Sequence, residues 1–403
     1  MRILLIHNYY QQRGGEDECA EQDGRLLRSR GHEVSLYSRH NDEIKALSLR
    51  GKVILFLETL WSRRTVRDIR RMVAEFKPDV AHVHNFFPLI SPSVFHACKA
   101  AGVPVLYTLH NYRLMCPTGW FFRNAAACED CATHSLWQGL RYRCYHESRS
   151  QTAAVALMLW AHRRLRTWQK TVTAYVVLSE FSRRKFEEAG LPANRLFLRR
   201  NFQEATPSRD EQPRSGALFV GRLSREKGVE FLLRSWRQLP EVPLTLLGDG
   251  PLRLWVERYV TENGMRQVQI AGFRPQAEIV QRLRSAEVLI VPSLWYEVCI
   301  RMIIEAYAAG TPVVASRLGS LVDMVSHGQT GLLFNPEDEA DLAAKVKQAI
   351  ANPPETERWG REARIRFKRD FSPDVAYTRL LDIYAMALDL QNRKPTDGDP
   401  ISS

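Results

Sequence analysis

Residues 295–316 read WYEVCIRMIIEAYAAGTPVVAS, and this stretch decides the fold. It contains a loop that follows an apolar run, a helical segment and the next buried strand. Glu297 and Glu305 are separated by seven residues, and the second lies inside the helical segment. The amino end of that helix, with its free amides and positive dipole end, opens at the carboxyl end of the preceding strand. Phosphate binds favourably at such a position.

On both sides of this stretch, short runs rich in Val, Ile and Leu alternate with longer segments of helical period. Continuous apolar runs are typical of parallel sheets that are covered on both faces. The predicted strands are Arg2–His7, Glu33–Tyr37, Asp79–His84, Pro104–Leu109 and Ala174–Leu178, then Ala217–Gly221, Pro243–Gly248, Val268–Gly272, Val288–Pro292 and Pro312–Ser316. We therefore predict an α/β fold with two doubly wound, Rossmann-like parallel-sheet domains that face each other across a cleft.

The domain boundaries follow from a composition change. A stretch rich in Pro, Ser and charged residues separates the two strand series and predicts a linker at 203–216. The predicted domains are 1–202 and 217–371, and a helix at 372–390 is expected to pack back on the first domain. Residues 391–403 are predicted as a tail. Residues 112–150, rich in Cys, Arg and aromatic residues, form a predicted insertion.

The net charge is +12 over 403 residues. Residues 1–200 contain 31 Lys and Arg against 18 Asp and Glu, and the remaining residues contain 26 against 27. The excess therefore lies in the first half. It suggests an acidic partner, such as an anionic membrane surface or a phosphorylated acceptor, or else a solvated Arg-rich surface. No nucleic acid is expected, because no recognition helix or stacking motif accompanies the arginines.

No apolar run approaches the roughly 20 residues of a membrane span. The chain starts directly with a buried strand, so we expect no leader and a cytoplasmic location, with peripheral attachment at the inner face of the plasma membrane as a further expectation. The segment Lys45–Met72 is apolar and then Arg-rich, which suits an interfacial helix. The alternative is a helix packed on the sheet.

The cysteines indicate reduced thiols rather than a disulfide framework. Four of them could instead form a structural zinc site: Cys116, Cys128, Cys131 and Cys144.

Further candidate residues follow other strands. In Gly221–Gly228 (GRLSREKG), Arg222 and Lys227 can converge on a diphosphate, Arg as a planar fork and Lys as a point charge. Gly248-Asp249-Gly250 and Gly272-Phe273 end two later strands, although a Gly-Asp-Gly is common as a plain turn. Gly14-Gly15-Glu16 follows the first strand, where glycines let a backbone approach a phosphate or sugar.

Histidines form a second group of candidates. His110 ends the strand before Asn111, and a lone histidine at a strand end is usually structural. His82 and His84 are two apart on one strand, so they point to the same face of the sheet. One of these two is expected to belong to the core.

Together these motifs resemble family 4 (group 1) glycosyltransferases, which have a Glu-x7-Glu signature followed by Ala-x-Ala-x-Gly-x-Pro-Val-Val-Ala. The resemblance covers essentially the whole chain. It implies the GT-B fold, a nucleotide-sugar donor with a UDP or GDP carrier, no cofactor and no metal. It further implies a retaining hexosyl transfer to a glycan or lipid-linked acceptor in polysaccharide synthesis.

The resemblance also implies roles for individual residues. Arg222 and Lys227 would contact the donor phosphates, Glu305 the ribose, Glu297 a sugar hydroxyl and His110 the transferred sugar. Further donor contacts would come from Gly15, from Phe273 near the base, and from the backbone at Cys299, Ile300 and Arg301. Gly14, Gly15 and Glu16 would face the acceptor.

One departure concerns the residues after the first glutamate. Most members have small residues there, whereas this chain has Val298 and Ile300, whose bulk is expected to narrow the pocket. Two alternatives stay open: a nucleotide-sugar epimerase of the same fold, and a non-catalytic protein that binds polyanions or lipids.

Overall fold

The computed structural model of the protein describes residues 1–205 and 214–392, apart from the side chains of Leu49 and Lys52. The described residues form two compact units. Unit 1 contains residues 1–119, 129–199 and the chain from Tyr377 onward, and unit 2 contains residues 120–128 and 200–376. Most of the predicted linker at 203–216 and most of the predicted tail at 391–403 lie outside the described residues.

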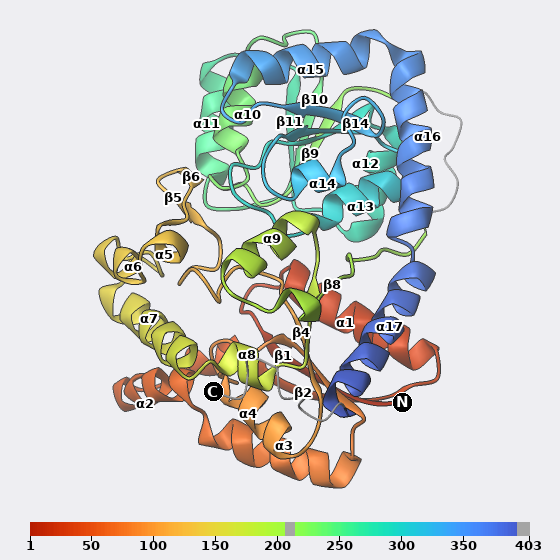
Figure 1. Ribbon diagram of the computed structural model, residues 1–403. Coiled ribbons are helices and arrows are strands. Elements are labelled where there is room, and N and C mark those ends of the chain that lie inside the picture. The colour runs from red at the N-terminus through yellow and green to blue at the C-terminus, as the bar shows by residue number, and fades with distance from the viewer. Residues whose placement is uncertain (206–213, 393–403) are drawn as a thin grey trace. The chain divides into compact units, whose positions relative to one another are not determined.

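Unit 1 is built on a six-stranded parallel sheet with the order β2-β1-β3-β4-β7-β8. Every residue of the two central strands β3 and β4 is buried, because helices cover both faces (Figure 1). Its strands are β1 (Arg2–Tyr9), β2 (Glu33–His40), β3 (Val80–Asn85), β4 (Val105–Thr108), β7 (Ala174–Val177) and β8 (Leu196–Leu198).

The helices of unit 1 follow these strands in chain order. They are α1 (Gly15–Ser29), η1 (Asn41–Ile44), α2 (Leu49–Leu60), α3 (Arg63–Phe76), α4 (Ser93–Ala100), α5 (Asp130–Thr133), α6 (Trp137–Arg141), α7 (Arg149–Arg164), α8 (Thr167–Thr171), α9 (Glu180–Glu188) and η2 (Ala193–Arg195). The last helix, α17 (Pro373–Asn392), contributes Tyr384, which donates or accepts a hydrogen bond with His82 of β3 at 2.8 Å.

Unit 2 repeats the architecture with a parallel sheet of order β11-β10-β9-β12-β13-β14. Its strands are β9 (Ala217–Val220), β10 (Leu244–Leu247), β11 (Val268–Gly272), β12 (Val288–Val291), β13 (Val313–Ser316) and β14 (Gly331–Phe334). Its helices are α10 (Val229–Trp236), α11 (Arg253–Glu262), α12 (Gln276–Ser285), α13 (Arg301–Ala308), α14 (Leu321–Met324), α15 (Glu339–Ala351) and α16 (Pro353–Asp370). A small hairpin, β5 (Phe122–Arg123) and β6 (Ala126–Ala127), also belongs to it.

Two hydrophobic clusters fill the faces of the unit 2 sheet. One contains Trp236 and Trp359, and the other contains Tyr307 and Phe371. The prediction of two doubly wound parallel-sheet domains is confirmed. The edge strands β8 and β14 were not predicted, because the apolar run in each is only three residues long, Leu196–Leu198 and 332–334.

Candidate active site

In unit 2, two glycines allow loops at the carboxyl edge of the sheet to meet. Gly228 has a φ of 73°, and a Cβ there would lie 1.9 Å from the carbonyl oxygen of Pro292. Gly248 has a φ of 136°, and its Cβ would lie 1.9 Å from the carbonyl oxygen of Gly221. Both distances exclude any side chain. The loops after β9, β10 and β12 are therefore in direct contact, and Arg222, Lys227 and Glu297 lie on two of them.

Lys227 and Glu297 are brought together by this packing. The Lys227 ammonium donates to Glu297 Oε1 at 2.5 Å, and Ser293 Oγ donates to the same oxygen at 2.9 Å. Glu297 is buried, whereas Lys227 is partly exposed. The ammonium also lies 5.3 Å from the centre of the Trp295 ring. The Lys227 ammonium thus lies at the carboxyl edge of the sheet, where it is paired with Glu297 and remains partly exposed to solvent.

Arg222 follows β9 and Phe273 follows β11, and both side chains are exposed. The Arg222 side chain makes no hydrogen bond or ion pair with other described residues, so its guanidinium is available to an anion. Phe273 is 78% exposed and follows β11, as a residue that stacks on a base would.

Helix α13 begins at Arg301 without a side-chain cap, because its N-cap residue is Ile300. Its first amides therefore remain available to an anion. One turn further, the buried Glu305 carboxylate accepts from Gln276 Nε2 at 2.8 Å, and an Arg301 nitrogen lies 3.9 Å from it. The sequence indicated Glu305 but missed Gln276, the first residue of α12.

The residues between the two glutamates point largely inward. Ile300 belongs to a core cluster of unit 2, and Val298 is buried as well, so the bulk predicted to narrow the pocket lies mostly beneath the surface. Burial raises the pKa of the Cys299 thiol to about 11. This cysteine is therefore protonated near neutral pH and is a poor nucleophile.

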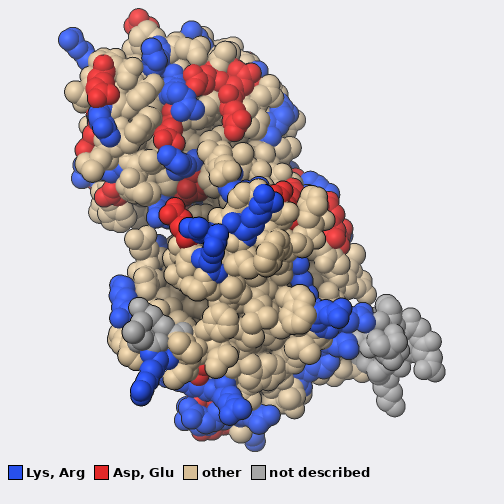
Figure 2. All heavy atoms as spheres, turned by 90° about the vertical axis from the view of Figure 1, so that its left-hand side faces the viewer, with Lys and Arg blue, Asp and Glu red and all other residues tan. Residues whose placement is uncertain are grey.

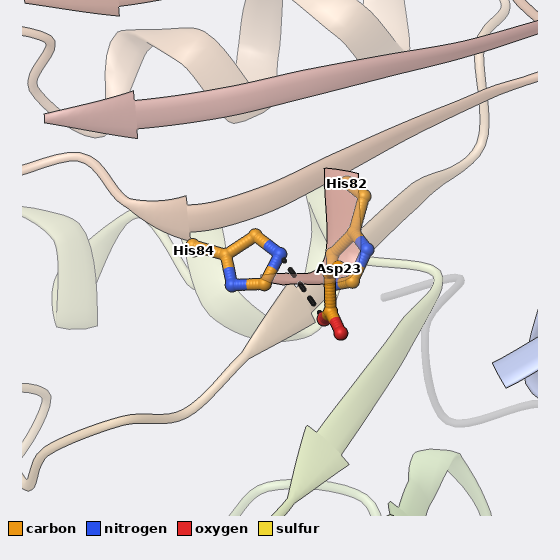
Figure 3. Close-up of side chains that lie close together, drawn as sticks. All are labelled: Asp23, His82 and His84. Atoms are coloured by element: carbon orange, nitrogen blue, oxygen red, sulfur yellow. Dashed lines mark ion pairs between the residues drawn. The ribbon is translucent and has the colours of Figure 1, made fainter. Parts of the chain in front are cut away.

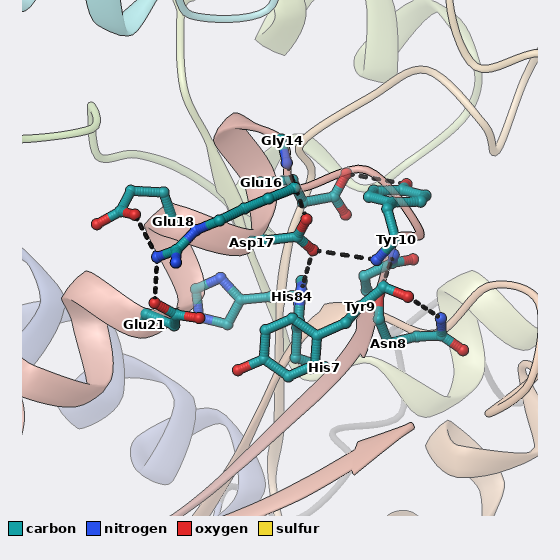
Figure 4. Close-up of polar contacts among 12 residues, drawn as sticks. His7, Asn8, Tyr9, Tyr10, Gly14, Glu16, Asp17, Glu18, Glu21 and His84 are labelled. Carbon is teal, nitrogen blue, oxygen red and sulfur yellow. Dashed lines mark hydrogen bonds and ion pairs between the residues drawn. The ribbon is translucent and has the colours of Figure 1, made fainter. Parts of the chain in front are cut away.

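In unit 1, Gly14, Gly15 and Glu16 begin α1, and Figure 4 shows the surrounding contacts. The Asp17 side chain caps the amino end of the helix. One of its carboxylate oxygens accepts from the Gly14 amide at 2.9 Å, and the other contacts His7 Nε2 at 2.7 Å. A Cβ on Gly14 would meet nothing within 4 Å, so local packing does not require a glycine there.

The Glu16 side chain makes hydrogen bonds with two neighbouring residues. Its carboxylate accepts from the Tyr10 hydroxyl at 3.1 Å and from Asn111 Nδ2 at 3.2 Å. Burial raises the pKa of the Glu16 carboxyl to about 7, although His7 and the Tyr10 hydrogen bond act in the opposite direction. The residue next to His110 in sequence therefore contacts the Gly-Gly-Glu motif.

His110 follows β4, and its Nε2 lies 3.0 Å from Nδ1 of His84 on β3. Burial lowers the pKa of His110 to about 3. His82 and His84 are both buried, whereas the sequence assigned only one of them to the core.

The predicted zinc ligands do not form a metal site in the described part of unit 1. Cys116, Cys131 and Cys144 lie in that unit, and their thiols are not grouped there at ligand distances from one another. Cys116 instead contacts Thr118 Oγ1 at 3.1 Å.

Two families of known proteins match consecutive parts of the chain. The family described as "Glycosyl transferase 4-like domain" matches residues 14–201, and that described as "Glycosyl transferases group 1" matches residues 201–366. The chain belongs to the group 1 glycosyltransferases. A relative of this glycosyltransferase is the glycogen synthase of Mycobacterium tuberculosis, which is 28% identical over 337 residues, or 81% of this chain and 73% of the relative.

Solved structures with the same fold cover 96% of this glycosyltransferase. Anabaena HepE in complex with UDP superposes with a TM-score of 0.68 at 20% identity over 100% of its own chain, and its complex with UDP-glucose gives 0.67 at 17% over 99%. Sucrose-phosphate synthase from Thermosynechococcus elongatus gives 0.73 at 21% identity over 99% of its chain. The predicted GT-B fold is confirmed.

Proposed function

We propose that this glycosyltransferase uses a nucleoside-diphosphate sugar, bound by unit 2, and transfers the sugar with retention of configuration without a metal ion. The observation that carries the proposal is the meeting of Lys227, Glu297 and the uncapped amino end of α13 at the carboxyl edge of one sheet. A diphosphate needs fixed positive charge, and the Lys227 ammonium, the exposed Arg222 and the helix dipole supply it.

In this mechanism an acceptor hydroxyl oxygen forms a bond to the anomeric carbon while the bond from that carbon to the diphosphate oxygen breaks. Attack comes from the face that the diphosphate leaves, which retains the configuration, and the hydroxyl proton passes to a phosphate oxygen. Lys227 and Arg222 stabilise the charge that grows on the diphosphate. Glu297 accepts from a sugar hydroxyl, Glu305 from the ribose, and Phe273 stacks on the base.

In unit 1, we assign His110 to the transferred sugar and Gly14, Gly15 and Glu16 to donor and acceptor contacts. The carrier is proposed to be a uridine or guanosine diphosphate, with UDP favoured by the ligands bound to HepE. The synthesis of a cell-surface or lipid-linked glycan is the proposed setting.

The test is a panel of UDP-, GDP- and ADP-sugars, scored first by thermal shift and then by release of the nucleoside diphosphate with EDTA present. Stabilisation by one nucleotide class and EDTA-insensitive release support the proposal. Conversion of the donor to an epimer without release supports an epimerase instead, and no stabilisation by any nucleotide sugar supports a non-catalytic binding protein.

We further propose that the acceptor is presented at a membrane, because two neighbouring helices of unit 1 have apolar solvent faces. On α2 the exposed positions are Val53, Ile54 and Leu57, followed by Trp61, at helical spacing. Ile54 is 56% exposed. A surface helix normally turns its polar side chains outward, so this reversed pattern needs an apolar partner.

Helix α7, which packs against α2, continues this surface. Its exposed Leu157 and Trp160 form an apolar groove with Trp137 of α6, which is 68% exposed. Figure 2 faces this side of unit 1 and shows a broad uncharged area with Lys and Arg at its borders. We call the exposed apolar residues of α2, α6 and α7 the apolar face.

The charge around the apolar face is positive. Helix α3 begins two residues after Trp61 and exposes a series of arginines, and α6 and α7 end in exposed arginines. These residues are Arg63, Arg64, Arg67, Arg70 and Arg71 on α3, with Arg141 on α6 and Arg164 on α7. Apolar side chains bordered by arginines match an anionic lipid headgroup layer. Among the described residues, no helix is long and apolar enough to cross a bilayer.

A further inference from the structure

Three buried histidines of unit 1 lie on neighbouring strands, His7 on β1 and His82 and His84 on β3. Within this group His84 contacts His110, and the two rings stack with centroids 5.2 Å apart. The remaining ring nitrogen of His84, Nε2, faces Asp23 Oδ2 at 3.6 Å and has no hydrogen-bond partner among the described residues.

Asp23, His82 and His84 form the one group of three candidate metal ligands in the described part of the chain (Figure 3). Their other contacts argue against a cation. Arg199 donates to both oxygens of Asp23 at 2.5 and 2.8 Å, so a guanidinium already neutralises this carboxylate. Both nitrogens of His82 are engaged, one by Tyr384 and the other by Thr108.

The same contacts determine which nitrogen of each ring carries the proton. Burial lowers the pKa of both His84 and His110, so both rings are neutral near pH 7 and each has one N–H. At His84, an N–H on Nε2 points toward the Asp23 carboxylate, whereas a lone pair there would face a negative charge. Nδ1 of His84 is then an acceptor, and it receives the N–H of His110 Nε2.

We propose that Asp23 and His84 are positioning residues that fix His110 in the tautomer protonated on Nε2. The Nδ1 lone pair of His110, which makes no hydrogen bond with the described residues, is then presented as an acceptor for a ligand hydroxyl. This inference deepens the proposed function, because it rests on the assignment of His110 to the sugar. Asp23, held by Arg199 from the end of β8, sets the direction of the whole chain of contacts.

The position of the proton can be measured without any substrate. In protein labelled with ¹⁵N-histidine, two-bond nitrogen–proton couplings distinguish the two neutral tautomers, and comparison with His110→Asn assigns the signal. We expect the wild-type protein to have His110 protonated on Nε2. Asp23→Asn, whose amide can donate to His84 Nε2, is expected to reverse both tautomers, so that His110 is protonated on Nδ1.

A matched pair of variants isolates the contribution of His84. His84→Asn keeps an acceptor close to the Nδ1 position and should preserve the wild-type tautomer of His110, whereas His84→Ala should give a mixture. His82→Asn, which alters a ring without contact to His110, is the control for loss of packing and should leave the tautomer unchanged.

A wild-type His110 protonated on Nδ1, or a tautomer that is identical in Asp23→Asn and His84→Ala, overturns the proposal. If Asp23→Asn does not fold, the wild-type spectrum and the comparison of His84→Asn with His84→Ala still test the proposal. The readout is separate from turnover. If the tautomers behave as expected but no nucleotide sugar binds, the proposed function fails and the positioning chain stands.

Discussion

Lys227 and Glu297 form an ion pair with 2.5 Å between Nζ and Oε1, and they come from the loops after β9 and β12. The pair holds the ammonium at the sheet edge while Ser293 and a buried position fix the carboxylate. In the proposed function an incoming diphosphate would meet a cation whose position is already set, and electrostatic stabilisation is most effective when such groups need no reorganisation.

The first prediction concerns Lys227→Ala. Charge grows on the diphosphate as the glycosidic bond breaks, so loss of the ammonium should lower kcat by about 10²-fold or more. Nucleotide release from the active donor measures this effect. Arg225→Ala is the matched control, because Arg225 is an exposed cation on the same loop whose nearest carboxylate is Glu230 at 3.6 Å. It should retain near-normal turnover. Full activity of Lys227→Ala, or recovery of its rate with added magnesium, would contradict the assignment.

The second prediction concerns Glu305→Ala. The carboxylate is proposed to meet ribose hydroxyls that do not change during the reaction, so its loss should weaken nucleotide binding by about 1.5–3 kcal/mol. Turnover at saturating donor should largely persist. Calorimetric titration with the nucleoside diphosphate gives the affinity. Gln276→Ala tests whether Glu305 contacts the nucleotide directly. Gln276 only donates to the Glu305 carboxylate, at 2.8 Å, so its loss should weaken nucleotide binding less than the loss of Glu305 does. Unchanged affinity with a lowered kcat would reverse the roles of Glu305 and Lys227.

The third prediction concerns the pH dependence of stability. Burial raises the pKa of Glu16 from 4.5 to about 7, so between these values the folded protein binds more protons than the unfolded chain. The free energy of unfolding should therefore fall as the pH rises from about 4.5 to about 7, by on the order of 1–3 kcal/mol from this group. Denaturant titrations across this range should show a shallower decline for Glu16→Gln than for the wild-type protein. Equal slopes would show that Glu16 titrates normally.

Local patterns predicted most of the fold. Strands such as β7 and β12 are continuous apolar runs, and parallel pairing with helical crossovers follows from that pattern. For the site, the sequence allowed individual residues to be predicted but not the contacts between them. That Lys227 pairs with Glu297 depends on Gly228 packing against Pro292, a tertiary contact that no local period records.

The contacts that the sequence missed have the same origin. Gln276 and Asp23 lie in ordinary helical segments, and each acquires a partner only through tertiary packing. Gln276 of α12 contacts Glu305 of α13, and Asp23 of α1 contacts Arg199, which follows β8. The apolar face was predicted on α2 alone. Helix α7 has a mixed composition, and only its packing shows that Leu157 and Trp160 are turned to solvent.

The last prediction concerns this apolar face. The double substitution Ile54→Gln and Leu57→Gln removes exposed apolar area, so it should change the free energy of unfolding by no more than about 0.5 kcal/mol. Burying such a side chain in a bilayer is worth about 1.5–3 kcal/mol, and loss of two should therefore lower vesicle binding by at least about tenfold. Co-sedimentation with phosphatidylcholine vesicles, with and without phosphatidylglycerol, measures binding.

Two controls separate the contributions to vesicle binding. Leu254→Gln removes a side chain of α11 in unit 2 that is more exposed than either residue of the α2 pair, at 77%, and should not change the binding. Arg70→Gln with Arg71→Gln should weaken binding only to vesicles that contain phosphatidylglycerol, and added salt should reproduce that loss, because screening weakens attraction between exposed charges and anionic headgroups. If the wild-type protein does not co-sediment with either kind of vesicle at low salt, the apolar face does not bind lipid. If Leu254→Gln reduces binding as much as the α2 pair, the attachment is not specific to unit 1.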